Sequence, residues 1–358
     1  MIQKILYKGD NPIKTKSGGD WINQRNILAL KELYKENLHI YPIKCENKIF
    51  TFINLLNRYM LGLSFYKAKQ IIAYIKKNKI TEVFLASSKY GKIAQLIKKK
   101  FPNIKIYIFF HNIEKQYTEE EYKVNPNWKN KIITKVTAFN EDLSCQFAEK
   151  LIVLNQRDNL LLDKYYKKEA HIILPTTFID KYDPLKAKNE NVNKQFILLF
   201  VGFAFFANIE GIKWFIDSVM PSLQNCKLQI VGNGMDKIFK SSKNIEVHGF
   251  VEDLASFYYN CDIVVLPILS GGGMKTKTAE ALMYGCPIVG TKEAFEGYEL
   301  DYNKIGGIAN GSEEMIAQIS NLMSKKEELY HKKEYARYIF KKKYSFENTI
   351  VSLKNLYK

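Results

Sequence analysis

The stretch between Pro267 and Thr291 combines three features that suit the binding of a phosphorylated ligand. A buried, strand-like run ends at Pro267 and leads into three consecutive glycines, which let the backbone approach a ligand closely. Two lysines come next, at the start of a helical run whose first N–H groups have no partner inside the helix. The residues concerned are Gly271, Gly272, Gly273, Lys275, Thr276, Lys277, Thr278 and Glu280. Because helix N-termini and lysines both attract anions, the sequence predicts a phosphate site here.

Glu280 adds a second kind of contact to this stretch. It falls in the first turns of the helical run, where its carboxylate could accept hydrogen bonds from two hydroxyls of a ribose or a sugar. The alternative is a tight strand-to-helix turn with solvated lysines and no ligand. The combination of glycines, lysines and a carboxylate favours the ligand site.

Composition and cysteine usage restrict the class of protein. The chain has 358 residues, of which 46% are hydrophobic and 25% charged, so it has room for two globular domains. Its five cysteines are scattered and contain no C-x-x-C pair, which predicts a reduced, cytoplasmic chain without a disulfide framework or zinc site. The start lacks the apolar core of a signal peptide. The longest near-continuous apolar run, 196–209, is shorter than the roughly 20 residues of a membrane-spanning helix.

The positive charge is concentrated in the first half of the chain. Residues 1–178 contain 31 Lys and Arg against 16 Asp and Glu, whereas residues 179–358 contain 23 against 21. Such a domain could adhere to anionic lipid headgroups or gather a phosphorylated substrate, or it could simply carry solvated lysines. Nucleic acid is not favoured, because only four of the 54 basic residues are arginine, the side chain best suited to phosphates and bases.

Apolar, strand-like runs alternate with amphipathic helical ones, which is typical of parallel α/β sheets. In the first half we expect strands at 4–8, 81–87, 104–110 and 150–155, with helices such as 21–35, 65–77, 92–101 and 128–148. In the second half we expect strands at 195–202, 227–232, 245–249, 261–267 and 286–291. The predicted fold class is therefore α/β, with two tandem Rossmann-like domains whose parallel sheets face a central cleft.

Polar residues 183–194 read as a linker between a first domain at 1–182 and a second at 195–336. The basic helical segment 337–358 is expected to pack back onto the first domain. No Asp-x-Asp, histidine pair at metal spacing or G-x-S-x-G is present, so no metal or cofactor is expected.

The second half resembles the donor-binding domain of GT-B glycosyltransferases, in particular the retaining group numbered family 4. The resemblance runs through ordered blocks that cover nearly all of 196–300: FVGFAFFANIEGIKWFIDSVMPSL, LQIVGNG, IEVHGFVEDLASFYYNCDIVVLP, GGGMKTKTAEALMYGCPIVGT and EAFEG. The first half is similar to the acceptor-binding domain through Ser17-Gly18-Gly19 ahead of a helix, HNIEKQY from His111, and FAEKLIVLNQRD.

The resemblance implies roles for individual residues. Glu280 matches the second glutamate of the paired-glutamate motif, which holds the ribose, whereas the first glutamate would fall at Gly272, so this chain has a glycine-rich variant. Phe203 follows Gly202 where many relatives carry a basic residue, which leaves the diphosphate to Lys275 or Lys277 and the N–H groups of 276–278.

Further roles fall outside that loop. Gly18 and Gly19 match the loop that approaches the same phosphates, and His111 matches the histidine near the transferred sugar. His111 could instead be a hydrogen-bonded histidine at a strand end. Phe250 and Val251 match the segment that lines the base, with a place in the core as the alternative.

The expected function is that of a metal-independent, retaining glycosyltransferase. It would move a sugar from a UDP- or GDP-linked donor to a hydroxyl of a glycan or lipid-linked acceptor, in bacterial surface polysaccharide assembly. The protein is expected in the cytoplasm, at the inner face of the membrane, with the basic domain as the docking surface. Two alternatives stay open: a sugar-nucleotide epimerase or hydrolase on the same fold, and a non-catalytic nucleotide- or membrane-binding partner of an active transferase.

Overall fold

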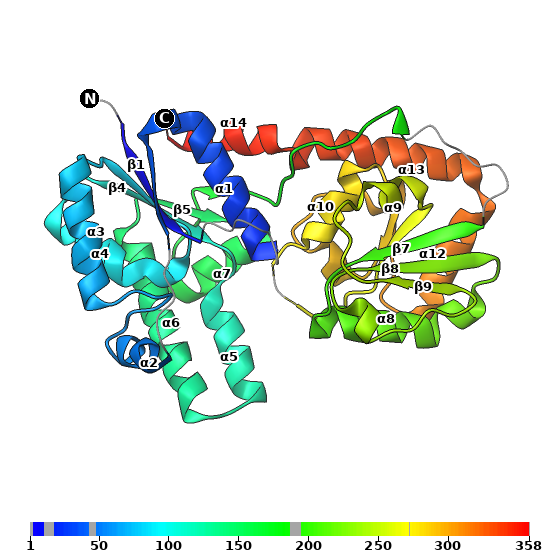
Figure 1. The fold of residues 1–358 in the computed structure, drawn as a ribbon, viewed down its shortest axis with the longest axis horizontal. Helices are drawn as coiled ribbons and strands as arrows, with labels where there is room; N and C mark the ends of the chain where they lie inside the picture. Colours follow the sequence, from blue (N-terminus) through cyan, green and yellow to red (C-terminus); the bar gives the residue numbers. More distant parts are fainter. Residues whose placement is uncertain (1–2, 11–17, 43–47, 187–194, 272, 358) are drawn as a thin grey trace. The chain divides into compact units, whose positions relative to one another are not determined.

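A computed structural model describes residues 3–10, 18–42, 48–186, 195–271 and 273–357. The chain divides into two compact units (Figure 1). Unit 1 comprises Met1–Pro175 together with Thr349–Lys358, and unit 2 comprises Thr176–Asn348. No helix among the described residues is both long enough and apolar enough to cross a membrane.

Unit 1 is built on a parallel sheet with the strand order β2-β1-β3-β4-β5-β6 among its described residues. The strands are β1 (Ile5–Gly9), β2 (Leu38–Pro42), β3 (Glu82–Leu85), β4 (Lys105–Phe110), β5 (Lys150–Val153) and β6 (Ile172–Ile173). The helices are α1 (Gly18–Tyr34), α2 (Lys48–Leu56), α3 (Phe65–Asn78), α4 (Gly91–Lys100), α5 (Glu114–Val124), α6 (Trp128–Phe147) and α7 (Gln156–Tyr166). The central strands are buried along nearly their whole length, as expected where helices cover both faces of a sheet.

Unit 2 repeats this architecture with the strand order β12-β11-β10-β7-β8-β9, again parallel throughout the described residues. The strands are β7 (Phe196–Val201), β8 (Cys226–Val231), β9 (Ile245–His248), β10 (Ile263–Leu266), β11 (Ile288–Gly290) and β12 (Gly306–Ile308). The helices are α8 (Phe206–Ser218), α9 (Ala255–Asn260), α10 (Thr276–Met283), α11 (Tyr302–Ile305), α12 (Ser312–Ser324) and α13 (Lys326–Ile339). In Figure 1, α8 lies along one side of the sheet and α10 and α13 along the other.

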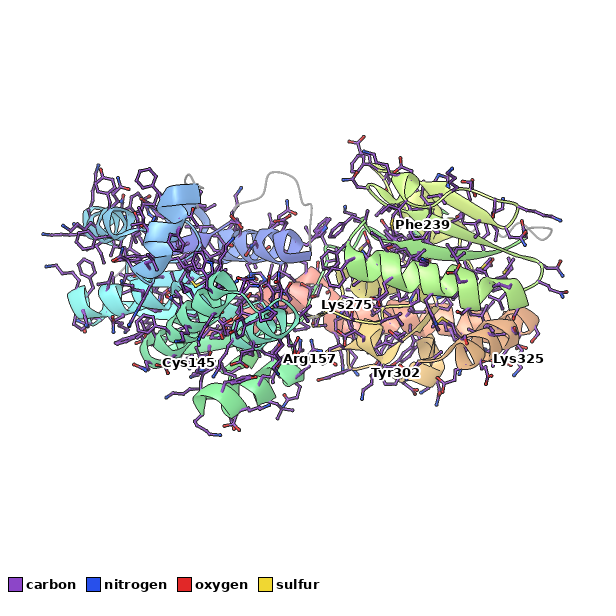
Figure 2. The ribbon with its side chains drawn as sticks, turned by 90° about the horizontal axis from the view of Figure 1, so that it is seen from below. Cys145, Arg157, Phe239, Lys275, Tyr302 and Lys325 are labelled. Atoms are coloured by element: carbon purple, nitrogen blue, oxygen red, sulfur yellow. The ribbon has the colours of Figure 1, made fainter. Side chains whose placement is uncertain are left out.

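The structure confirms the α/β class and the two parallel sheets. The sequence did not identify β2, β6 or β12, which are edge strands or half-buried ones with a weak apolar signal. Cys45 lies outside the described residues, and the other four cysteines are free thiols, with the Cys145 side chain labelled in Figure 2.

The division between the units differs from the boundaries expected from the sequence. Residues 176–182 and 337–348 were expected in the first domain, and residues 183–186 in a linker. All of them belong to unit 2. Two backbone hydrogen bonds join these segments: the Phe178 N–H donates to the Tyr344 carbonyl, and the Phe346 N–H donates to the Phe178 carbonyl. Arg337 adds an ion pair with Asp180, with Nη2 and Oδ2 2.7 Å apart. The remaining linker residues, 187–194, lie outside the described part.

The end of the chain returns to unit 1 through α14 (Phe346–Leu356), whose last residues belong to that unit. Leu353 is completely buried there. The Tyr357 ring meets Tyr34 and Tyr107 edge-on, with centroid distances of 5.5 and 4.6 Å. The C-terminal segment therefore completes the core of unit 1.

We predict that Leu353→Ala lowers the free energy of unfolding of unit 1 by about 2–5 kcal/mol, because it opens a cavity at a fully buried position. Val351→Ala is the matched control, since Val351 lies two residues away on the same helix and is exposed. Urea unfolding followed by tryptophan fluorescence and circular dichroism measures both. Equal unfolding midpoints for the two variants would show that α14 does not stabilise unit 1.

Candidate functional site

The candidate ligand-binding residues of unit 2 gather at the carboxyl edge of its sheet. The strands are parallel, so their following loops emerge at the same edge, which is where open α/β sheets bind ligands. β10 leads into the glycine loop and α10, β7 leads to Gly202 and α8, and β11 leads to a 3₁₀ helix at Lys292–Phe295. Adjacent strands in the order β11-β10-β7 therefore supply the glycine loop and the residues around it.

Two glycines allow this arrangement. Gly273 has φ +63°, in the left-handed region that residues with a Cβ rarely adopt. Gly211 in α8 touches the end of β10 so closely that a Cβ there would lie 1.8 Å from the Pro267 carbonyl oxygen. Gly271 is exposed, and Gly272 lies outside the described residues.

Lys275 is held inside the loop by a neighbouring carboxylate. Its Nζ lies 2.6 Å from Glu293 Oε1 and donates to the Gly273 carbonyl at 2.9 Å. Lys275 (labelled in Figure 2) is also the residue from which α10 starts. Its charge is therefore compensated by Glu293, and the pair joins the glycine loop to the 3₁₀ helix after β11.

Lys277 stands in a different environment, with a neutral partner. Its Nζ donates to Asn208 Oδ1 at 2.5 Å and lies 4.8 Å from the centre of the Phe200 ring. Asn208 donates its own Nδ2 to the Phe203 carbonyl at 2.8 Å, which turns the amide oxygen towards Lys277. Burial and repulsion by Lys275 lower the pKa of Lys277 to about 7. A bound anion would supply the counter-charge that the ammonium group lacks.

Gly202 supports the same contact from the end of β7. A Cβ at Gly202 would lie 3.0 Å from Asn208 Nδ2 and 3.1 Å from the Phe200 ring. The absence of a side chain at position 202 therefore leaves room for Asn208 and Phe200, the two side chains beside the Lys277 ammonium group.

The start of α10 retains two N–H groups for a ligand. The Tyr298 hydroxyl accepts from the Ala279 N–H at 3.1 Å and donates to the Lys275 carbonyl at 2.6 Å. Thr278 donates its N–H to that carbonyl at 3.0 Å and its hydroxyl to the Ala294 carbonyl at 2.7 Å. Within the described part of the chain, the N–H groups of Thr276 and Lys277 have no partner. The expectation of three N–H donors from 276 to 278 is therefore reduced to two.

Glu280 lies one helical turn after Thr276. The Tyr258 hydroxyl donates to Oε2 at 3.0 Å, and the Tyr258 ring stacks on Tyr284 with centroids 4.8 Å apart. Burial raises the pKa of Glu280, against the hydrogen bond from Tyr258 and the charge of Lys181. One carboxylate oxygen thus has a fixed donor, and the other has acceptor capacity to spare.

The two residues expected beside the base, Phe250 and Val251, differ in their exposure to solvent. Phe250, in the loop after β9, is 76% exposed, so its alternative place in the core is wrong. Val251 is partly buried. Phe203, Phe205 and Phe206 form a further exposed aromatic cluster directly after Gly202, with neighbouring ring centroids 5.9 and 4.4 Å apart.

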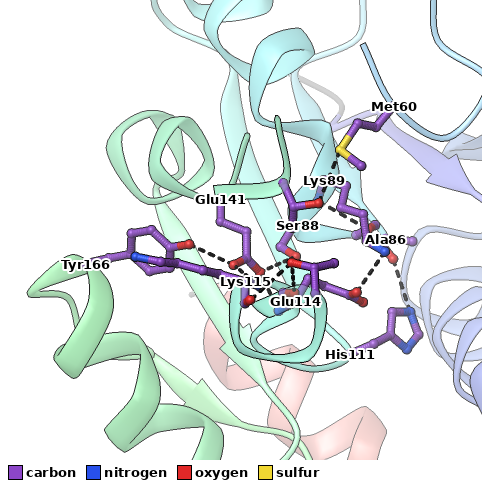
Figure 3. A network of polar contacts seen from close by, with 12 residues as sticks. Met60, Ala86, Ser88, Lys89, His111, Glu114, Lys115, Glu141 and Tyr166 are labelled. Carbon is purple, nitrogen blue, oxygen red and sulfur yellow. Dashed lines mark hydrogen bonds and ion pairs between the residues drawn. The ribbon is translucent and has the colours of Figure 1, made fainter. Parts of the chain in front are cut away.

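Unit 1 places His111 directly after β4. Its Nε2 lies 3.1 Å from the Ala86 carbonyl oxygen (Figure 3). The same nitrogen lies 3.2 Å from Asn23 Oδ1. Since a carbonyl can only accept, Nε2 carries the proton and Nδ1 keeps its lone pair. Burial and the charge of Arg25 lower the pKa of His111 to about 4. His111 is therefore neutral near pH 7 and has an acceptor nitrogen available.

A buried carboxylate anchors the segment that carries His111. Glu141 on α6 is fully buried and accepts from the N–H groups of Glu114 and Lys115 at 2.9 and 3.0 Å (Figure 3). Ser88 and Tyr166 donate their hydroxyls to it at 2.9 and 2.8 Å. Glu141 therefore caps α5 just after the HNI segment and ties it to α6 and α7.

Gly18 and Gly19 are the first residues of α1 rather than a loop ahead of it. Six residues of these contacts carry no signal in the sequence: Asn208, Glu293, Tyr258, Tyr298, Asn23 and Glu141. These residues act through contacts 16 to 88 positions away, and no local pattern marks them.

The fold and the site together define a class of protein. Two parallel α/β units in tandem, with a glycine loop and a helix N-terminus at the sheet edge of the second, are the GT-B fold. Residues 195–325 match the family described as Glycosyl transferases group 1. That region contains the glycine loop, α10 and Asn208.

The known proteins that are similar to this chain include the following three. An uncharacterized 44.6 kDa protein in the cps region of Klebsiella pneumoniae is 28% identical over 268 residues, which cover 68% of this chain and 66% of that protein's length. Sucrose-phosphate synthase from Thermosynechococcus elongatus has a similar structure, with a TM-score of 0.75, 13% identity and coverage of 99% and 98% of the two chains. Anabaena HepE in complex with UDP has a TM-score of 0.74, 13% identity and 99% coverage of both chains. The two solved structures show that the chain has the GT-B fold, and the family match over 195–325 supports a glycosyltransferase.

We predict that Glu141→Gln lowers the free energy of unfolding by about 1–3 kcal/mol. The amide nitrogen would replace an oxygen that faces donors, which leaves a buried N–H without an acceptor. Glu121→Gln on the exposed side of α5 is the matched control and should change stability little. Urea unfolding measures the difference, and unchanged stability in Glu141→Gln would contradict the anchoring role.

Proposed function

We propose that this protein is a metal-independent, retaining glycosyltransferase of the family 4 type. It moves a sugar from a nucleoside diphosphate donor to a hydroxyl of a glycan or lipid-linked acceptor. The observation that carries this proposal is Lys277, a partly buried lysine with a neutral partner, beside two N–H groups at the start of α10 that have no partner among the described residues. The match of residues 195–325 to group 1 glycosyltransferases supports the same assignment.

The diphosphate of the donor is assigned to Lys277 and the start of α10. When the bond between the anomeric carbon and the diphosphate breaks, negative charge develops on the departing oxygen. The Lys277 ammonium group and the N–H groups of Thr276 and Lys277 would stabilise that charge, which is the role a metal ion has in other transferases. Lys275, already paired with Glu293, would hold the glycine loop in place.

The ribose is assigned to Glu280 and the base to the loop that carries Phe250 and Val251. Tyr258 orients one carboxylate oxygen of Glu280 and leaves acceptor capacity for ribose hydroxyls. The exposed Phe250 ring can stack on a base, which is worth about 1–3 kcal/mol per base in single-stranded nucleic-acid complexes.

The sugar and the chemical step are assigned to the region around His111. Neutral His111 would accept a hydrogen bond from a sugar hydroxyl through Nδ1. In the retaining, front-face route, the acceptor oxygen bonds to the anomeric carbon on the face that the diphosphate leaves. The acceptor's proton moves to the departing phosphate oxygen, so no side-chain nucleophile is required. Gly18 and Gly19 at the start of α1 are proposed to approach the same phosphates.

We also propose a cytoplasmic protein at the inner face of the membrane, in surface polysaccharide assembly. The relative from the Klebsiella pneumoniae cps region supports the pathway class. The excess of 31 basic over 16 acidic residues in 1–178 supports an anionic membrane surface as the docking partner.

The first test is thermal stability in the presence of UDP, GDP, CDP, ADP and their sugars, with EDTA throughout. A ligand at a hundred times its dissociation constant should add about 2.7 kcal/mol to stability and raise the melting temperature. We expect a shift with one diphosphate, and its loss in Glu280→Ala. Glu313→Ala, at an exposed carboxylate on α12, should keep the shift. The absence of a shift with every nucleotide would refute the transferase assignment.

We further predict that nucleoside diphosphate affinity falls as the pH rises above 7. Because the pKa of Lys277 is about 7 without ligand, the ammonium form that binds phosphate is lost above that pH. The dissociation constant should increase by up to about tenfold per pH unit between 7 and 9. Isothermal titration calorimetry measures it, and Lys277→Gln should bind weakly at every pH, with a flat profile. Lys213→Gln, at an exposed position of α8, should keep the slope; a flat wild-type profile would exclude Lys277 from the phosphate site.

A further inference from the structure

Unit 1 exposes large apolar side chains on and around α2. Phe50, Ile53 and Leu56 are 60%, 48% and 56% exposed and lie on one side of the helix, because they are three residues apart. On the opposite side of the helix Phe52 and Leu55 are partly buried, and the Phe52 ring meets Trp128 edge-on at 5.7 Å. A surface helix that is apolar on its outer side as well as its inner side needs a partner for the outer side.

Further large apolar side chains of unit 1 are exposed on the neighbouring α6 and on α3, the next helix along the chain. Trp128 itself is 66% exposed at the start of α6, which contacts α2 (Figure 1). Phe65 and Tyr66, at the start of α3, are 63% and 70% exposed. We call Phe50, Ile53, Leu56 and Trp128, which lie on α2 and on the helix in contact with it, the α2 face.

The segment between α2 and α3 is fixed to the rest of unit 1. The Arg58 carbonyl accepts from Asn140 Nδ2 at 3.1 Å, and the Arg58 guanidinium lies 4.4 Å from the Phe139 ring centre. Lys92 lies 4.0 Å from the Tyr59 ring centre. These contacts to α6 and α4 hold α2 and the start of α3 in place, so the α2 face is a preformed surface.

Positive charge surrounds the α2 face without any acidic residue in the same segments. Residues 48–81 contain seven Lys or Arg and no Asp or Glu, and residues 122–140 contain four Lys and again no acidic residue. Lys69, Lys129 and Lys131 are exposed. The neighbouring α5 carries three consecutive acids, Glu119, Glu120 and the exposed Glu121, of which the first two accept hydrogen bonds from Tyr165 and Gln116.

From this juxtaposition of apolar and basic groups, we propose that the α2 face docks unit 1 onto a bilayer of anionic phospholipids. Apolar side chains would enter the headgroup region, and the surrounding lysines would contact lipid phosphates, as amphipathic surface helices do. The proposal gives the membrane association proposed above a definite surface, but it does not depend on the transferase activity.

Two other occupants fit the surface less well. A second copy of the chain would bring two sets of lysines together, which costs free energy through like-charge repulsion. Nucleic acid would use the cations but would leave Phe50, Ile53 and Leu56 without apolar partners. An anionic bilayer satisfies both the apolar and the basic groups.

Flotation of the whole chain with lipid vesicles tests the proposal. We expect binding to vesicles that contain phosphatidylglycerol, weaker binding at high salt, and little binding to phosphatidylcholine alone. The triple variant Phe50→Ser, Ile53→Ser, Leu56→Ser should weaken binding by about tenfold or more. Lys129→Gln with Lys131→Gln should also weaken it, and more so at low salt than at high salt.

Matched controls separate the α2 face from general stickiness and charge. Leu160→Ser, at a 62% exposed position of α7, and Lys99→Gln with Lys100→Gln, at the end of α4, should bind like the unmodified protein. No binding at low salt, equal binding to phosphatidylcholine alone, or full binding by the triple variant would each overturn the proposal.

A second measurement keeps this proposal distinct from the proposed activity. The nucleotide-induced melting shift is recorded for the triple variant, without vesicles or acceptor. A retained shift with lost flotation supports the α2 face and shows that the variant is folded. Flotation that depends on the α2 face, without any nucleotide shift in the unmodified protein, would support docking while refuting the transferase assignment.

Discussion

The parallel alignment of the strands is the constraint on which the rest of the structure depends. Every strand pair among the described residues is parallel, so the carboxyl ends of neighbouring strands open at one edge. In unit 2 this brings Asn208 to Lys277 and Glu293 to Lys275, although the partners of each pair are far apart in the chain. In unit 1 it brings Asn23 and Ala86 to His111. This alignment supplies the glycine loop with the partner Glu293 from the neighbouring strand's loop.

Burial at these edges gives the polar groups their chemical character. It lowers the pKa of Lys277 and His111 and raises that of Glu280, so each charged form is disfavoured in the unliganded protein. A ligand with complementary charge or hydrogen-bonding groups would remove this cost, which couples binding to stability. Structural carboxylates are satisfied differently: Glu141 has four donors and Glu293 has Lys275. Groups with incomplete partners are therefore the better candidates for function.

The sequence predicted the strands that are buried and strongly apolar, and it missed those whose burial depends on neighbours. β4 and β7 are continuous apolar runs, so their type was evident. β2 is only half-buried and β12 consists of two glycines and one isoleucine, so neither carries a clear pattern. The boundary between the units was also out of reach, because the bridge between Phe178 and Ser345 joins residues far apart in the chain.

For the candidate site, the sequence by itself determined the glycine loop, the helix after it and the presence of Lys275, Lys277 and Glu280, because these residues are adjacent in the chain. Only the tertiary structure distinguished the two lysines, by pairing Lys275 with Glu293 and Lys277 with the neutral amide of Asn208. It also showed that two N–H groups at the start of α10 already have acceptors: the Ala279 N–H donates to the Tyr298 hydroxyl and the Thr278 N–H to the Lys275 carbonyl. Partners of this kind come from other loops. The strength of an ion pair or hydrogen bond depends on the distance between its two groups in space, and the order of residues along the chain does not specify that distance.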